Sequence, residues 1–146
     1  MARGEQFFKN LSGVDIIGNG VDRCSVPTIR RILEQTPSFI VETFADWEII
    51  YCEQARNELI RAQRYAGRFA AKEAVTKALG LNGYGVNFQE ISVLKEKSGK
   101  PFIYLDGEVK RHAEILGVNT ILLSITHSRS SALAWCIAVS GNNTAH

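Results

Sequence analysis

One short stretch of the chain, residues 66–80, places an acid among several bases at helical spacing. Glu73 and Lys77 are four residues apart, so they project from one face of a helix, and Arg68 and Lys72 share a neighbouring face. A carboxylate flanked by cations suits a metal ion and a phosphate group bound side by side. The alternative is a solvated helix face on which the charges pair with one another. That face would comprise Arg61, Arg64, Arg68, Lys72 and Lys77.

A second acid, Asp22, follows two glycines near the start of the chain. Gly18 and Gly20 allow the backbone to bend sharply at the end of an expected strand, which would present Asp22 to a ligand. An aspartate and a glutamate from distant segments supply the hard oxygen ligands that Mg²⁺ prefers, with water and phosphate in the remaining positions. Two alternatives stay open. In the first, Asp22 starts a turn or caps the next helix. In the second, the acid of this motif is Asp15, which ends an earlier Gly-Val-Asp.

Polar residues also gather at the end of a strand in the second half of the chain. Residues 124–128 read Ser-Ile-Thr-His-Ser, which places His127 where an expected strand opens into a loop. A lone histidine is more often structural than catalytic. Gly-Lys-Pro at 99–101 is likewise compatible with a simple hairpin turn.

Composition limits the classes of protein to which the chain can belong. Its 146 residues are 45% apolar and 22% charged, as in an ordinary globular domain, and the net charge of +2 is too small to indicate a nucleic-acid partner. No apolar run approaches the roughly 20 residues that cross a bilayer, and the start lacks the apolar core of a signal peptide. We therefore expect a cytoplasmic protein without a membrane partner. Three widely spaced cysteines predict neither a disulfide framework nor a zinc cluster.

The elements that must position these residues form one α+β domain. We expect the domain over residues 13–140, a loosely ordered leader over 1–12 and a flexible tail over 141–146. Valine- and isoleucine-rich runs predict an antiparallel or mixed sheet of about five strands, at 14–21, 88–95, 101–105, 120–126 and 131–139. Apolar spacing and end signals predict helices at 27–35, from a cap at Asp46, at 57–79 and at 108–116. The long helix at 57–79 carries Glu73.

Taken together, these segments resemble one family, the holo-acyl-carrier-protein synthases, which are small 4'-phosphopantetheinyl transferases. The resemblance runs in order over about residues 14–139. Its most specific part is Ala-Gly-Arg-Phe-Ala-Ala-Lys-Glu-Ala at 66–74, with Lys77 four residues after the glutamate. The other matching motifs are Gly-Val-Asp at 20–22, Phe-Gln-Glu-Ile at 88–91, Gly-Lys-Pro at 99–101 and Ser-Ile-Thr-His-Ser at 124–128.

The resemblance implies a role for each matching residue. Asp22 and Glu73 match the carboxylates that hold Mg²⁺ against the pyrophosphate of coenzyme A, and Lys77 matches the lysine that contacts this phosphate. Three residues, Arg68, His127 and Ser128, match family positions that are associated with the nucleotide half of coenzyme A, especially its 3'-phosphate. Lys100 and Pro101 match positions that lie near the family's adenine pocket.

The implied reaction is phosphoryl transfer in fatty acid biosynthesis. A serine hydroxyl of an apo acyl carrier protein attacks the β-phosphorus of coenzyme A, and adenosine 3',5'-bisphosphate leaves. The serine proton needs an acceptor, for which Glu73, Asp22 and a metal-bound water are candidates; we rank Glu73 first. Two other classes stay open: a coenzyme A- or nucleotide-binding protein without catalysis, and a structural interaction domain in which Glu73 and Lys77 only pair with each other.

The resemblance also implies two macromolecular partners. The carrier protein is expected to be acidic, so that Arg23, Arg30 and Arg31, at or just after the first motif, would dock it. Short members of the family are trimers with active sites between subunits. We therefore expect a homotrimer in which Asp22 and Glu73 of one chain meet binding residues of its neighbour.

Overall fold

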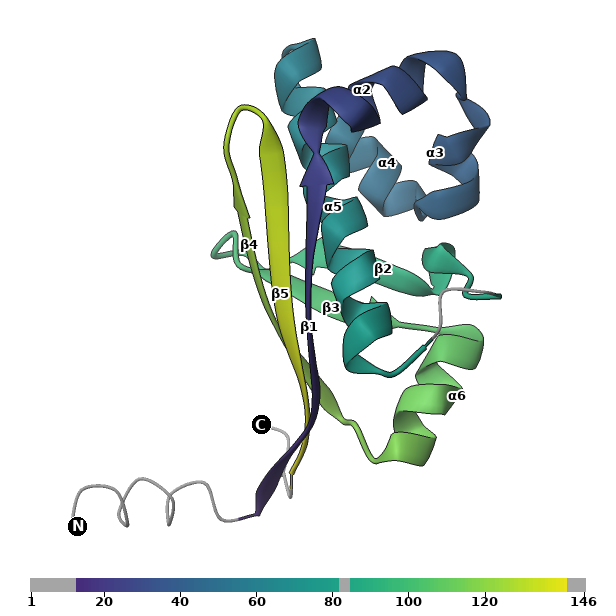
Figure 1. The fold of residues 1–146 in the computed structure, drawn as a ribbon, viewed down its shortest axis with the longest axis vertical. Coiled ribbons are helices and arrows are strands. Elements are labelled where there is room, and N and C mark those ends of the chain that lie inside the picture. Colours follow the sequence, from purple (N-terminus) through teal and green to yellow (C-terminus); the bar gives the residue numbers. More distant parts are fainter. Residues whose placement is uncertain (1–12, 82–84, 142–146) are drawn as a thin grey trace, which may run out of the picture.

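The computed structural model describes residues 13–81 and 85–141, which form an α+β fold in two layers (Figure 1). The predicted leader lies outside the described residues, as do residues 142–146 of the predicted tail. The remaining tail residue, Gly141, is the last residue of a strand and pairs with Val14. No helix within the described ranges is long and apolar enough to cross a membrane.

Three antiparallel strands form the larger sheet, in the order β1 (Val14–Ser25), β5 (Ser131–Gly141) and β4 (Thr120–His127). Residues alternate along β5 with the period of two that strands impose. Ala134 and Cys136 are buried on the inner face, whereas Leu133 and Trp135 are exposed on the outer face. Within the described chain, therefore, helices cover only the inner face of this sheet.

The long helix α5 (Glu58–Ala78) lies along the inner face, as Figure 1 shows. Asn57 begins it by accepting a hydrogen bond from the Ile60 amide at 2.9 Å. Close packing against β1 depends on glycine, because a Cβ atom at Gly18 or Gly20 would run into the helix backbone at Ala78 or Ala74. The prediction of a glycine turn before Asp22 was wrong: the strand continues to Ser25, and its glycines make room for the helix.

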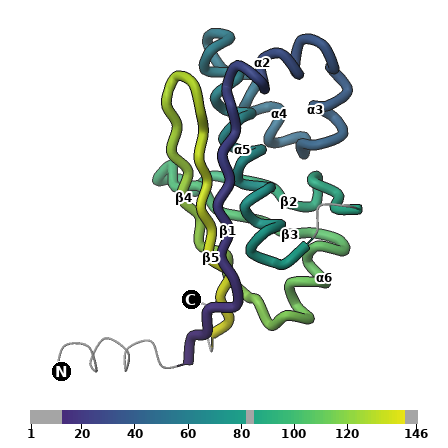
Figure 2. Tube along the Cα trace, in the orientation of Figure 1, coloured from purple at the N-terminus to yellow at the C-terminus, as the bar shows by residue number. Residues whose placement is uncertain are grey.

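Three shorter helices gather at the N-terminal end of α5 (Figures 1 and 2). They are α2 (Val26–Gln35), α3 (Ser38–Thr43) and α4 (Asp46–Glu53). Ser25, not Asp22, caps α2 by accepting a hydrogen bond from the Thr28 amide at 3.2 Å. The predicted cap at Asp46 was wrong by one residue: Asp46 is the first residue of α4, and the cap is Ala45, whose amide donates to Oε1 of Glu48 at 3.0 Å.

The remaining strands form a separate sheet. A 3₁₀ turn, η1 (Phe88–Glu90), leads into β2 (Ile91–Lys95), which pairs antiparallel with β3 (Pro101–Leu105) through a hairpin. Helix α6 (Gly107–Leu116) follows and ends at Gly117, whose φ of 82° lies in the left-handed region. The five expected strands are present, but in sheets of three and two, because β3 packs near β4 without a hydrogen-bond ladder.

Candidate functional site

Two of the predicted acids and the predicted lysine lie together between β1 and α5. Asp22 projects from the inner face of β1, and the Nζ of Lys77 donates to its Oδ1 at 3.0 Å. The same Nζ donates to the carbonyl oxygen of Val21 at 3.1 Å. Glu73 is one helical turn before Lys77, and the charges of both Asp22 and Lys77 shift its pKa. The structure therefore brings together Asp22, Glu73 and Lys77 from segments about 50 residues apart, which gives a cluster that we call the acid cluster.

The electrostatics of the acid cluster favour a bound cation. Burial raises the pKa of Glu73 above its ordinary value, the negative charge of Asp22 raises it further, and Lys77 opposes both effects. Among the described residues no group of three histidines, cysteines or acids could hold a metal. A metal held by Asp22 and Glu73 would thus take its other ligands from water or phosphate, which is how Mg²⁺ commonly binds. The donor set of the acid cluster fits that ion.

A second group of predicted residues lines a cavity of about 490 Å³ near the other end of α5. Arg68, Pro101 and His127 are among its lining residues, and Asp22, Glu73 and Lys77 are not. We call it the cationic cavity, because Arg64 and Lys95 also line it. Because several cationic side chains line it, the cationic cavity suits an anionic ligand.

Arg68 is the most deeply placed cation of the cavity. Only 6% of its surface is exposed, and its Nε has no hydrogen-bond partner within the described ranges. Its guanidinium carbon lies 3.9 Å from the centre of the Tyr51 ring. Sequence reasoning missed Tyr51, Arg64 and Lys95 as site residues. One signal was available, because Arg64 is one turn before Arg68 on the same helix.

Two other predicted residues, Ser128 and Lys100, do not line the cationic cavity. Ser128 is tied to α5 by its carbonyl oxygen, which accepts a hydrogen bond from Gln63 at 3.0 Å. Its hydroxyl accepts from the amides of Ser130 and Ser131 and so stabilises the turn after β4. Lys100 is exposed and lines a neighbouring groove instead of the cationic cavity. A ligand role for either residue remains a prediction.

Lys72 departs from the pattern of an exposed helix face. It is completely buried, and its Nζ lies 2.6 Å from Oε1 of Glu48, which is also completely buried. The same Nζ donates to the carbonyl oxygens of Phe88 and Ile91, while the Val93 amide donates to Oε2 of Glu48 at 3.0 Å. Lys72 therefore joins α5 to α4 and β2, and it is unavailable to a phosphate.

The acid cluster and the cationic cavity lie on opposite sides of α5. Arg68 and Lys77 are nine residues apart, which at about 100° per residue leaves them half a turn from each other around the helix axis. Glu73 lies on the same side as Lys77. One chain therefore presents the two halves of the predicted site in different directions.

The three arginines predicted to dock a carrier are all exposed. Arg30 and Arg31 lie on α2, where Arg30 forms a surface ion pair with Glu34 at 3.8 Å. Arg23 lies in β1 and projects from the outer face of the sheet. They do not form one cluster on a single element.

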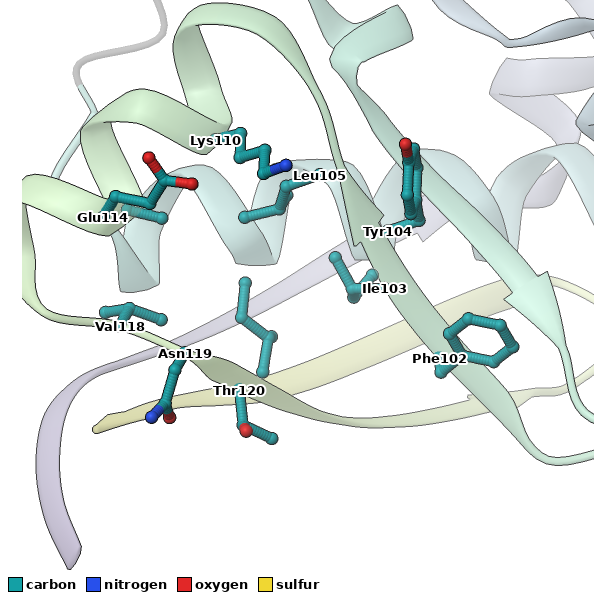
Figure 3. A pocket seen from close by; sticks show the side chains of 11 residues that line it. Phe102, Ile103, Tyr104, Leu105, Lys110, Glu114, Val118, Asn119 and Thr120 are labelled. Atoms are coloured by element: carbon teal, nitrogen blue, oxygen red, sulfur yellow. The ribbon is translucent and has the colours of Figure 1, made fainter. Parts of the chain in front are cut away.

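A further groove, of about 560 Å³, lies between β3, α6 and the start of β4 (Figure 3). Its walls are mainly apolar, with Phe102 and Tyr104 on one side and Lys110 and Glu114 from α6 on another. It contains none of the predicted site residues, so size alone does not identify the functional cavity.

Comparison with known proteins identifies the family of the chain. The family model described as the 4'-phosphopantetheinyl transferase superfamily matches residues 18–137. The chain is 42% identical over 124 residues to a holo-[acyl-carrier-protein] synthase from Solibacter usitatus, covering 84% of this chain and 97% of that protein.

Two solved structures have the same fold. The holo-ACP-synthase from Plasmodium yoelii is 35% identical with a TM-score of 0.79, and the match covers 90% of this chain and all of that one. A holo-(acyl-carrier-protein) synthase from Bacillus anthracis, solved in complex with CoA (3',5'-ADP), is 29% identical with a TM-score of 0.71, covering 86% and 98% of the two chains. The family match, the identity to the relatives and the shared fold together assign the chain to the 4'-phosphopantetheinyl transferase superfamily.

Proposed function

We propose that the protein transfers the 4'-phosphopantetheine arm of coenzyme A to a serine of an apo acyl carrier protein, in fatty acid biosynthesis. The observation that carries this proposal is the acid cluster of Asp22, Glu73 and Lys77. Two carboxylates and a lysine meet at a partly open surface, in a chain whose relatives are named holo-acyl-carrier-protein synthases. A binding protein that had lost catalysis would be expected to lack one of these three groups.

In the proposed reaction, the carrier's serine oxygen bonds to the β-phosphorus of coenzyme A. The bond from that phosphorus to the oxygen bridging to the α-phosphorus breaks, and adenosine 3',5'-bisphosphate leaves with the electron pair. We propose that Lys77 contacts the phosphate and offsets the negative charge that accumulates during transfer. Mg²⁺ held by Asp22 and Glu73 would supply further positive charge beside the pyrophosphate.

Glu73 is our preferred acceptor for the serine proton, directly or through water. Burial and the charge of Asp22 raise its pKa, which makes it a stronger base than an ordinary surface carboxylate. Asp22 and a metal-bound water remain the alternative acceptors.

We further propose a homotrimer with active sites between subunits. The outer face of the three-stranded sheet exposes large apolar side chains, as expected of a surface that another chain covers. This face includes Val21, Leu122, Leu133 and Trp135. Because the acid cluster and the cationic cavity point to opposite sides of α5, a neighbouring chain is needed to bring them to one ligand. The cytoplasmic location stays a prediction.

The function is tested by incubating the protein with Mg²⁺, coenzyme A and an apo carrier, and then weighing the carrier. We expect a mass gain equal to one phosphopantetheine arm, lost when Glu73 is replaced by alanine and when the metal is removed with a chelator. No gain with any carrier, despite tight binding of coenzyme A, would favour a non-catalytic binding protein. Failure of both transfer and binding would favour a structural interaction domain.

We also propose that Arg30 and Arg31 dock an acidic carrier. Reversing both charges with Arg30→Glu and Arg31→Glu should raise the KM for the carrier far more than the KM for coenzyme A, because steering acts on the encounter with the protein partner. Steady-state kinetics with each substrate varied in turn measures both constants. Equal effects on the two constants would refute the docking role.

A further inference from the structure

Lys77 has two carboxylates within reach and pairs with only one of them. Glu73 is four residues before it on α5, which is the spacing of a helical ion pair. The Nζ of Lys77 instead lies 3.0 Å from Oδ1 of Asp22 on β1, and within the described ranges Glu73 forms no ion pair. Lys77 is therefore the counter-ion of Asp22 and not of Glu73.

The backbone of β1 holds the ammonium group beside Asp22. β1 is an edge strand of the larger sheet, so the carbonyl oxygens on its free side need partners from outside the ladder. Lys77 supplies one, since its Nζ donates at 3.1 Å to the carbonyl oxygen of Val21. The side chain of Lys77 is nevertheless 54% exposed, against 24% for Asp22. It can therefore turn to another acceptor without disturbing the core.

The position of this ammonium group conflicts with a divalent cation at Asp22. Mg²⁺ binds carboxylate oxygens at about 2.0–2.1 Å and needs near-octahedral geometry. A lysine bonded to the same carboxylate repels the ion and occupies part of its acceptor capacity. Lys77 and a metal ion therefore oppose each other at Asp22.

The charges of the acid cluster point to the ligand that resolves this conflict. With both carboxylates ionised, Asp22 and Glu73 carry two negative charges and Lys77 one positive charge, so the acid cluster is negative. A divalent cation alone would make it positive, and a pyrophosphate with two negative charges would make it negative again. A phosphate oxygen also offers Lys77 an acceptor in place of Asp22. Metal and pyrophosphate should therefore bind better together than apart.

We propose that Lys77 competes with the metal ion for Asp22 and leaves this carboxylate for the pyrophosphate of coenzyme A when the metal binds. This inference rests on the proposed function. The lysine thereby couples the two binding events, because the metal displaces it at little cost only when a phosphate is present to accept it. By linkage, the metal strengthens the binding of coenzyme A by the same factor.

The test measures metal binding without the carrier, so that no transfer takes place. Mn²⁺ is the probe, because it suits the same carboxylate and water ligands and is detected directly by electron paramagnetic resonance. Without coenzyme A, Lys77→Met should bind Mn²⁺ about fivefold more tightly than wild type, the factor expected when an exposed ion pair no longer has to be broken. Saturating coenzyme A should remove most of this difference. Lys77→Gln, which also lacks the charge, should behave in the same way.

Two matched variants test whether the effect belongs to a charge at residue 77. Lys77→Arg keeps the charge and should bind Mn²⁺ as wild type does. Lys97→Met removes an exposed lysine from the β2–β3 hairpin and should also leave Mn²⁺ affinity unchanged. Asp22→Asn should weaken Mn²⁺ binding, which locates the ion at this carboxylate.

The sign of the change separates competition from other roles of Lys77. A lysine that only contacts the phosphate would lose transfer on substitution without changing Mn²⁺ affinity, and one that orients Asp22 for the metal would lose affinity. Either result for Lys77→Met and Lys77→Gln would overturn this inference, while transfer by the wild type would leave the proposed function standing. If the wild type transfers no arm and Asp22→Asn binds Mn²⁺ as wild type does, both fail.

Discussion

Two adjacent residues of α5 have different environments. Lys72 has no exposed surface and is fully bonded within the core, whereas Glu73 is only partly buried and faces Asp22 and Lys77. A helix rotates by about 100° per residue, so neighbours in sequence reach different surroundings. Charge at residue 72 therefore serves folding, and charge at residue 73 is available for chemistry.

Glu73→Gln should stabilise the ligand-free protein at neutral pH. Because the folded-state pKa of Glu73 is raised, the native state binds more protons than the unfolded state in the range just above the ordinary value of 4.5. Stability from this group is thus present at low pH and is lost as pH rises through the folded pKa. Urea unfolding of both proteins across pH should show the variant more stable at neutral pH and equal to wild type below 4.5. A variant less stable than wild type at neutral pH would contradict the assignment.

At the scale of elements, local patterns predicted α2, α4, α5 and α6 but missed α3, and they predicted the sheet only partly. The caps and the apolar spacing of α5 and α6 are properties of short segments, so both were expected within about two residues of their observed ends. The division into two sheets depends on how β3 meets β4, which no local pattern encodes. Gly18 and Gly20 were misinterpreted for the same reason, because the helix that they contact is more than 50 residues away.

Local sequence patterns also predicted only part of the candidate site. Asp22, Glu73 and Lys77 belong to matching motifs and were predicted, whereas Tyr51 and Lys95 are single residues on other elements. Only the packing of α4 and β2 against α5 brings these two residues to Arg68. A cluster made of isolated residues leaves no spacing signal in the sequence.

The contact between β1 and α5 gives a prediction at this scale. Gly20→Ala should destabilise the fold by about 1–3 kcal/mol, because the added methyl group would overlap the Ala74 carbonyl and push the strand away. Activity should fall further than stability explains, since β1 carries Asp22 and α5 carries Glu73. Denaturant unfolding and transferase assays at a temperature where both proteins are folded measure the two effects. Lys97→Ala, at an exposed position of the β2–β3 hairpin, should leave both nearly unchanged.

For the whole molecule, the uncovered face of the larger sheet predicts assembly. Trp135 is 51% exposed at the centre of this face, and Trp135→Glu should place a charge where another chain would pack. We expect the variant to be smaller in solution by light scattering and to lose activity while keeping its circular dichroism. The matched control is Ile115→Glu on α6, where the wild-type side chain is 78% exposed. Equal masses for wild type and Trp135→Glu would contradict an interface on this face.

An active site shared between two chains predicts that two different inactive variants restore activity when they are mixed in one trimer. Glu73→Ala and Arg68→Ala chains should each be inactive alone, since each lacks one half of the site. In trimers reassembled from an equal mixture, about a quarter of the sites would combine an intact Glu73 with a neighbour's intact Arg68, if the trimer is cyclic. Activity should therefore return to about that fraction of wild type. No recovery in trimers proven to be mixed by mass would mean that each site lies within one chain.

The buried pair of Lys72 and Glu48 has a consequence for how variation at this helix would be detected. Loss of either partner leaves an isolated charge in the core, so cells carrying such a variant should accumulate little protein. Loss of the next side chain, Glu73, should leave abundance intact and abolish only the product. A survey that scores protein level would find position 72 and overlook position 73, although the two letters stand side by side in one motif.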